Sequence, residues 1–110
     1  MIYITVKFPV RPGKADAFLD EAAVYTAATR AEEGNVFFEW SRSLDEPSTF
    51  VLLEAFRDAE AGAAHVAGQH VKDFFAWAPD WVTEKPQILY IDDPDITGFG
   101  PMGEIEPRGQ

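Results

Sequence analysis

Two histidines separated by five residues, His65 and His70, are the side chains of this chain best suited to acid–base chemistry. An imidazole changes charge near neutral pH, so either histidine could take the proton of a weakly acidic hydroxyl such as a phenol. The structural alternative is a hydrogen bond from His65 to a strand side chain such as Glu54, with His70 at the surface. Because their spacing is not the i, i+4 spacing of two metal ligands on one helical face, we expect no metal site. A metal held with Glu54 or Glu39 is the lesser alternative.

A second group of residues is suited to binding a flat ligand. Glu54 lies on an otherwise apolar strand, where a carboxylate must be paired or must face an opening. Asn35, at a turn, could hold a ligand oxygen, although its alternative role is to adopt a left-handed turn conformation. Aromatic side chains could wall a flat pocket, or could simply form the core and an interface. We therefore predict a substrate-binding set of Asn35, Trp40, Glu54, Tyr25 and Phe74.

The composition limits the partners and the compartment of this protein. Its 110 residues suffice for one small domain, with 19 acidic and 9 basic residues and a net charge of −10. So acidic a chain is unsuited to nucleic acid and to anionic membranes. With no cysteine, disulfides and thiolate catalysis are excluded. The first residues resemble a strand rather than a signal peptide, and no apolar run reaches membrane-spanning length, so we expect a cytoplasmic location.

Alternating strands and helices must position these side chains. Residues 2–9 alternate in polarity as a half-buried strand does, and residues 50–56 are apolar on both faces, as a doubly covered strand is. Prolines and glycines separate the segments. The predicted strands are 2–9, 36–43, 50–56 and one within 81–92, and the predicted helices are 14–30, 59–67 with Asp58 as its cap, and 71–78 after a break at Gly68.

The order of these elements, β-α-β-β-α-β, predicts an α+β fold of the ferredoxin-like kind. Such a fold has a four-stranded antiparallel sheet with both helical segments on one face. The other face would carry apolar side chains, including Tyr3, Phe37, Val51 and Leu53. A monomer rarely exposes so large an apolar patch, so we expect a homodimer in which two sheets stack. Residues 1–92 would form this domain, and residues 93–110, rich in proline and glycine, an irregular tail.

Several short motifs resemble one known family, in order and spacing, over residues 1–92. They are Glu33-Gly34-Asn35, Asp45-Glu46-Pro47, Phe50-Val51-Leu52-Leu53-Glu54, Arg57-Asp58, His65 and His70. In this arrangement they resemble the antibiotic biosynthesis monooxygenase domain. The resemblance implies a dimeric α/β barrel made of two ferredoxin-like subunits. It also implies a monooxygenase that needs no cofactor and acts on quinols or polyketide aromatics.

Haem-degrading relatives of that family resemble the chain less well. Their pattern has a tryptophan on the second helix and a histidine ten residues later, and here those positions look like His65 and Phe75. We therefore expect a cofactor-free monooxygenase that oxidises a small phenolic, quinol-like or polyketide aromatic substrate with dioxygen. His65 or His70 would act as the catalytic base. A non-catalytic dimer that binds a small ligand and an isomerase on the same fold are the alternatives.

Overall fold

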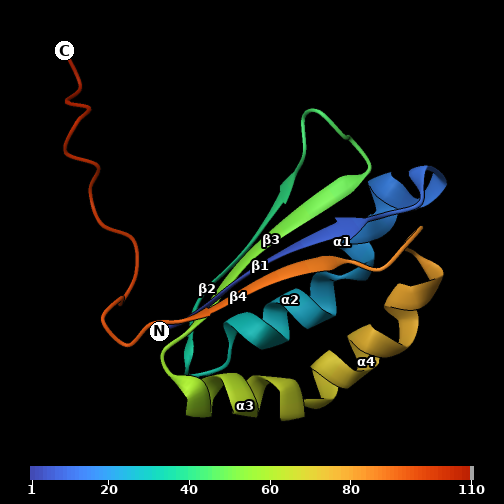
Figure 1. Cartoon of the computed structure of the whole chain (residues 1–110). Coiled ribbons are helices and arrows are strands. Elements are labelled where there is room, and N and C mark those ends of the chain that lie inside the picture. The colour runs from blue at the N-terminus through green and yellow to red at the C-terminus, as the bar shows by residue number, and fades with distance from the viewer. Residues whose placement is uncertain (110) are drawn as a thin grey trace.

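The computed structural model describes residues 1–109 as one sheet with helices against one of its faces (Figure 1). The elements in chain order are β1 (Ile2–Pro9), the 3-10 helix η1 (Pro12–Ala17), α1 (Phe18–Glu21), α2 (Ala23–Arg30), β2 (Asn35–Arg42), β3 (Thr49–Phe56), α3 (Ala59–Ala67), α4 (Gln69–Trp77), the 3-10 helix η2 (Ala78–Asp80) and β4 (Gln87–Asp92). Among the described residues, no helix has the length and apolar character needed to cross a membrane.

The four strands pair antiparallel in the order β2-β3-β1-β4, which confirms the predicted ferredoxin-like topology. The even-numbered residues Ile2, Val6 and Phe8 of β1 are buried, as the alternation of the sequence predicts. On the neighbouring strand β3, Leu52 and Phe56 are fully buried. The two central strands therefore supply the apolar floor on which the helices pack.

The prediction of one continuous helix over residues 14–30 is wrong. The chain forms η1, α1 and α2 instead, with a break at Ala22 between the last two. The hydroxyl of Thr26 donates a hydrogen bond of 2.8 Å to the carbonyl oxygen of Ala22, and such contacts bend helices. Pro12 stands at the start of η1, where its missing N–H costs no hydrogen bond. Despite the break, this region presents one face to the core, since Phe18, Ala22, Tyr25 and Thr29 are all buried.

The second helical segment, between β3 and β4, consists of the two helices α3 and α4, which meet at Gly68 as predicted. The carboxylate of Asp58 caps α3 by accepting a hydrogen bond of 2.9 Å from the backbone N–H of Ala61. Gly68 has an extended backbone, with φ −69° and ψ 145°, so α4 begins in a new direction. His65 and His70 therefore lie on two different helices, and the spacing rule for one helical face does not describe them.

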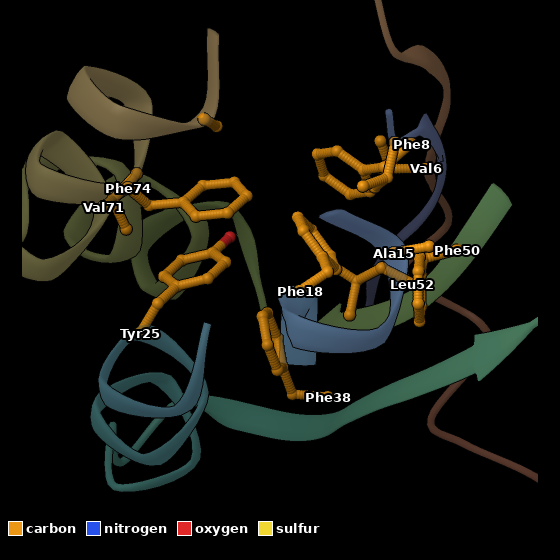
Figure 2. Packing of buried hydrophobic residues seen from close by; sticks show 12 residues of the cluster. Val6, Phe8, Ala15, Phe18, Tyr25, Phe38, Phe50, Leu52, Val71 and Phe74 are labelled. Atoms are coloured by element: carbon orange, nitrogen blue, oxygen red, sulfur yellow. The ribbon is translucent and has the colours of Figure 1, made fainter. Parts of the chain in front are cut away.

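The core between the sheet and the helices is largely aromatic (Figure 2). The ring centroid of Phe18 lies 4.9 Å from that of Phe50 and 6.1 Å from that of Phe8. Tyr25 of α2 stacks on Phe74 of α4, with centroids 4.1 Å apart and ring planes 8° apart. Each fully buried side chain of this size contributes roughly 1.5–3 kcal/mol. These rings are the main contacts that hold the helices to the sheet.

The sheet face away from the helices is only partly covered. Tyr3 and Phe37 are half-buried there, and Phe99 packs with its ring centroid 5.1 Å from that of Phe37. On β4, Leu89 is 68% exposed and Ile91 47% exposed. Residues 93–109 contain no helix or strand, and the later part of this segment runs away from the domain (Figure 1). The predicted tail extends to residue 110, which lies outside the described residues.

Candidate active site

A cavity of about 620 Å³ lies between the sheet and α4, beside the segment that leads into β4. Its walls are apolar, and include Ile4, Val6 and Phe8 of β1 with Val71 and Phe74 of α4. Exposed polar residues border it on the side of the solvent, namely Thr83, Glu84 and Lys85. A cavity of this size and lining suits a small, mostly apolar organic molecule.

Three polar side chains from three different elements line the buried part of this cavity. They belong to Tyr25 of α2, Glu54 of β3 and His65 of α3, and as whole residues these are 6%, 5% and 4% exposed. Figure 2 shows Tyr25 beside Phe74, with its hydroxyl pointing into the interior between the helices and the sheet. Polar groups that converge in an apolar cavity orient a ligand, and three titratable ones can also exchange protons with it.

His65 and His70 both contact one carboxylate, that of Glu32 in the turn after α2. Oε2 of Glu32 lies 2.7 Å from Nδ1 of His65 and 2.7 Å from Nε2 of His70. A carboxylate oxygen accepts hydrogen bonds, so this geometry favours the tautomers in which Nδ1 of His65 and Nε2 of His70 donate to Glu32. The second ring nitrogen of His65, Nε2, lies 3.6 Å from Oε1 of Glu54 at the cavity. When His65 is neutral and its Nδ1 donates to Glu32, the other ring nitrogen, Nε2, faces the cavity as a proton acceptor.

Burial and neighbouring carboxylates change the acidity of the other two polar groups. Burial, followed by the charge of Glu32, raises the pKa of Glu54 to about 7. Burial, followed by the charges of Glu54 and Glu32, raises the pKa of Tyr25 well above its usual range. Glu54 can therefore gain or lose a proton near neutral pH. Tyr25 keeps its proton, so its hydroxyl is available to donate a hydrogen bond to a ligand.

Two glycines let the segments of this cluster approach one another. A Cβ atom at Gly34 would lie 2.3 Å from Cβ of Ala61, so the turn that carries Glu32 packs directly on α3. A Cβ atom at Gly68 would lie 2.5 Å from Cε1 of His70, so the imidazole ring folds back over its own helix start. Any larger residue at either position would force these parts of the site to move.

The structure brings several of the predicted site residues together and separates others. Tyr25, Glu54, His65 and Phe74 line the cavity. His70 contacts the same oxygen of Glu32 as His65 does but does not line the cavity. Phe74 contributes a flat wall, because its ring stacks on that of Tyr25.

Asn35 and Trp40 make their contacts elsewhere, and neither lines the cavity. The side-chain amide of Asn35 donates to the carbonyl oxygens of Phe37 and Ala55, at 3.0 and 3.1 Å, where the pairing of β2 with β3 is irregular. The indole N–H of Trp40 donates a hydrogen bond of 2.9 Å to the hydroxyl of Thr26. Both contacts stabilise the fold, and the substrate-binding roles of the two residues stay predictions.

Glu32 is the site residue that the sequence reasoning missed. It belongs to a turn-forming Glu-Glu-Gly-Asn segment, and its contact with His65 spans 33 positions. The feature of the sequence that could have identified Glu32 is the predicted order and pairing of the strands. Because β2 and β3 are antiparallel, the start of β2 lies beside the end of β3, where α3 begins. A hydrogen bond of 2.8 Å from the backbone N–H of Arg57 to the carbonyl oxygen of Gly34 joins these two ends.

Glu32, His65 and His70 are also the one group, within residues 1–109, whose geometry could accommodate a metal ion, with donor atoms within 4.8 Å of one another. The carboxylate oxygen already lies at hydrogen-bond distance from both imidazoles, so these groups satisfy each other directly. Glu39, which the sequence offered as a partner for the histidines, is exposed on β2.

The fold and the site define a ferredoxin-like protein with an apolar cavity and buried groups able to exchange protons with its occupant. The sequence model of the antibiotic biosynthesis monooxygenase family matches residues 1–77. The chain belongs to this family, as the resemblance of its motifs predicted.

Known proteins of similar sequence and structure support this assignment. YcnE of Bacillus subtilis (strain 168), provisionally named a monooxygenase, is 36% identical over 76 residues, which cover 69% of this chain and 80% of YcnE. A provisionally named antibiotic biosynthesis monooxygenase from Nitrosomonas europaea has a TM-score of 0.78 and 27% identity, covering 84% of this chain and 98% of that one. Rv0793 from Mycobacterium tuberculosis has a TM-score of 0.78 at 22% identity, covering 88% and 98%, and shows the shared fold alone.

Proposed function

We propose that this protein is a monooxygenase that oxidises a phenolic or quinol-like aromatic substrate with dioxygen and without a bound cofactor. The observation that carries the proposal is the orientation of His65, whose Nδ1 is held by Glu32 while Nε2 lies beside Glu54 at the cavity. Membership of the family and the name given to YcnE support the same class of reaction.

The first step is the removal of a phenolic proton by Nε2 of His65. The carboxylate of Glu32 holds the imidazole ring and stabilises the imidazolium that forms, as a carboxylate does in other histidine-based sites. Tyr25 and the protonated form of Glu54 donate hydrogen bonds to the new phenolate oxygen. The substrate is then an electron-rich anion in an apolar cavity.

The second step is the reaction of this anion with dioxygen. One electron passes to dioxygen, which gives a semiquinone-type radical and superoxide, and the two radicals combine to form a C–O bond. The proton on His65 passes to the peroxide, the O–O bond breaks, and water leaves with the hydrogen of the attacked carbon. For a hydroquinone the balance is hydroquinone plus dioxygen to hydroxyquinone plus water, so no outside reductant is needed.

The apolar cavity assists the reaction by excluding water from the substrate. Its aromatic and aliphatic walls replace water around the substrate anion, which favours electron transfer to dioxygen and protects the peroxide from side reactions. The flat wall formed by Phe74 on Tyr25 favours a planar ring. These features support an aromatic substrate.

Oxygen uptake by the metal-free protein tests the proposal. With a panel of hydroquinones and anthrones, the wild type should consume oxygen faster than autoxidation and should place one atom of labelled dioxygen in the product. His65→Ala should lower kcat by roughly 10²–10⁴-fold, which is the usual contribution of a general base. Gln69→Ala, at the exposed start of α4, is the control and should leave kcat unchanged.

Two results would contradict this function. One is the absence of enzyme-dependent uptake with every substrate of the panel. The other is wild-type turnover by a folded His65→Ala variant. Conversion of a substrate without oxygen consumption would favour an isomerase, because His65 and Glu54, 3.6 Å apart, could equally move a proton within one molecule.

We also propose that the working form is a homodimer whose sheets pack face to face. The exposed Leu89 and Ile91 of β4 and the half-buried Tyr3 and Phe37 support this, because water-exposed apolar surface of this kind usually belongs to an interface. Light scattering should give twice the mass of one chain. Leu89→Asp should shift the protein toward the monomer. Val24→Asp, which changes a 79% exposed residue on the helical side, is the matched control.

A further inference from the structure

Three donor atoms, one each from Glu32, His65 and His70, lie within 4.8 Å of one another. We propose that these residues form a binding site for a zinc-type divalent cation, and that an ion bound there inhibits the reaction. The binding site follows from the geometry of the three side chains. The inhibition rests on the proposed function, because it acts through His65, the proposed base.

The donor atoms determine which ions the site would take. Oε2 of Glu32 is 2.7 Å from Nδ1 of His65 and 2.7 Å from Nε2 of His70. Imidazole nitrogens together with a carboxylate oxygen suit Zn²⁺ and its neighbours in the first transition series, whereas Mg²⁺ and Ca²⁺ prefer oxygen ligands. Three protein ligands leave the fourth position of a tetrahedral ion to water. We therefore expect the site to bind Zn²⁺ and to discriminate against Mg²⁺.

A small movement separates the hydrogen-bonded arrangement from a coordinated one. With bonds of about 2.0–2.2 Å to a tetrahedral ion, the donor atoms lie roughly 3.3–3.5 Å apart. The oxygen of Glu32 would thus withdraw from each imidazole by about 0.6–0.8 Å. Glu32 lies in the turn between α2 and β2, and its side chain and that of His70 are 18% and 19% exposed. The carboxylate therefore has room to move, and an ion can enter from the solvent.

The position of the two histidines on separate helices makes this arrangement possible. The expectation of no metal site came from a spacing rule for two ligands on one helical face. His65 lies on α3 and His70 on α4, and the two helices meet at Gly68. A Cβ atom at Gly68 would lie 2.5 Å from Cε1 of His70, so glycine leaves the space that this ring needs to reach Glu32.

The carboxylate of Glu32 has no fixed cation as its partner. Among residues 1–109, its ion-pair contacts are to the two histidines and not to a lysine or arginine. The nearby Arg57 pairs instead with Glu33, at 3.9 Å, and with Asp58, at 3.5 Å. A divalent ion would therefore neutralise the charge of Glu32 without displacing a salt bridge.

Glu54 supplies the outer contact that metal-binding histidines usually have. A histidine that binds a metal through one ring nitrogen commonly donates the N–H of the other nitrogen to a carboxylate. Nδ1 of His65 faces Glu32, and Nε2 lies 3.6 Å from Oε1 of Glu54, a few tenths of an ångström beyond a good hydrogen bond. The structure thus places a carboxylate at the ring nitrogen of His65 that an ion would leave free.

An ion at this site would inactivate the proposed base by changing its tautomer. A coordinated Nδ1 carries no hydrogen, so a neutral His65 then has its proton on Nε2 and donates it to Glu54. Nε2 can no longer accept a phenolic proton. No proton is gained or lost, because it moves between two nitrogens of one ring. Neither Glu32 nor His70 lines the cavity, so the ion acts through His65 and does not meet the substrate.

Calorimetric titration of the chelator-treated protein with Zn²⁺ tests the site. The wild type should bind one ion per chain, and Mg²⁺ should not compete. Glu32→Ala and His70→Gln each remove one ligand, and should weaken binding by more than the roughly 10–100-fold that loss of an outer contact costs. Glu33→Ala, which changes the adjacent and 94% exposed carboxylate, is the matched control and should bind Zn²⁺ as the wild type does.

Nitrogen NMR of the histidine rings, without substrate, tests the change of tautomer. In the metal-free wild type, His65 should carry its proton on Nδ1. Saturation with Zn²⁺ should move this proton to Nε2, and a chelator should reverse the change. In His70→Gln, the same concentration of Zn²⁺ should leave the ring of His65 in its metal-free state.

Oxygen uptake tests the inhibition. Saturating Zn²⁺ should lower kcat of the wild type and of Glu33→Ala toward that of His65→Ala, and a chelator should restore it. Mg²⁺ at the same concentration should have no effect. In His70→Gln, inhibition relative to its own metal-free rate should require a higher concentration of Zn²⁺, in proportion to its weaker binding.

Two results would overturn the site, namely no binding of Zn²⁺ by the wild type, or wild-type affinity in either folded ligand variant. Full or increased oxygen uptake by the zinc-bound wild type would overturn the inhibition. Failure of the proposed function is a different result, the absence of oxygen uptake by the metal-free wild type. Calorimetry and NMR need no turnover, so they decide the metal site in either case.

Discussion

Glu54→Gln should make the protein more stable at alkaline pH while it lowers catalytic activity. Glu54 is 5% exposed, and burial, with the nearby charge of Glu32, raises its pKa from 4.5 to about 7. Glutamine has nearly the shape of the protonated carboxyl group and cannot ionise. The substitution therefore removes the cost of a buried charge without opening a cavity.

The size and sign of the effect follow from proton linkage. The unfolded chain releases the proton of Glu54 near pH 4.5, whereas the folded chain holds it up to about pH 7. Between these values the folded state binds more protons, so its stability falls as the pH rises and stays reduced above about pH 7. The gap of about 2.5 pH units corresponds to about 3 kcal/mol. The glutamine variant should be more stable than the wild type by up to this amount at about pH 8.

Urea denaturation at about pH 4 and pH 8, at one protein concentration, measures the effect. At the lower pH both proteins are neutral at this position, and their free energies of unfolding should agree. Glu39→Gln, an exposed carboxyl on β2, is the control and should change stability by less than about 0.5 kcal/mol at both values. Equal stability of Glu54→Gln and wild type at alkaline pH would refute the reasoning. A loss of turnover in the same variant would show that the carboxyl group of Glu54 is needed for activity although its ionisation costs stability.

Substitutions at three further positions test local contacts of the fold. Gly34→Ala should destabilise the protein by roughly 1–3 kcal/mol in urea denaturation, because its Cβ would lie 2.3 Å from that of Ala61; unchanged stability would mean that the turn moves freely. Asp58→Ala should cost about 1 kcal/mol through loss of the α3 cap, and Asp58→Asn should recover most of it. Thr29→Val should leave the melting temperature unchanged or raise it, because the fully buried hydroxyl of Thr29 has no hydrogen-bond partner among residues 1–109; a clear loss would show that it has one.

Local patterns in the sequence predicted most of the fold. Alternating polarity placed the inward residues of β1, and the cap at Asp58 and the break at Gly68 were correctly located. These features depend on residues a few positions apart, so the chain itself displays them. The one wrong element is the continuous helix over 14–30, where the chain forms the 3-10 helix η1 first and then breaks at Ala22, beside which the hydroxyl of Thr26 bonds the carbonyl oxygen of Ala22.

The sequence by itself also determined which residues have the right chemistry, since His65, Glu54 and Tyr25 are titratable groups in apolar surroundings. Only the tertiary structure decided how they are connected. Glu32 meets both histidines because β2 and β3 pair antiparallel, which brings the turn before β2 to the start of α3. The same pairing directed Asn35 into the sheet instead of the cavity. A contact across 33 positions is a property of chain topology, and no local pattern of residues encodes it.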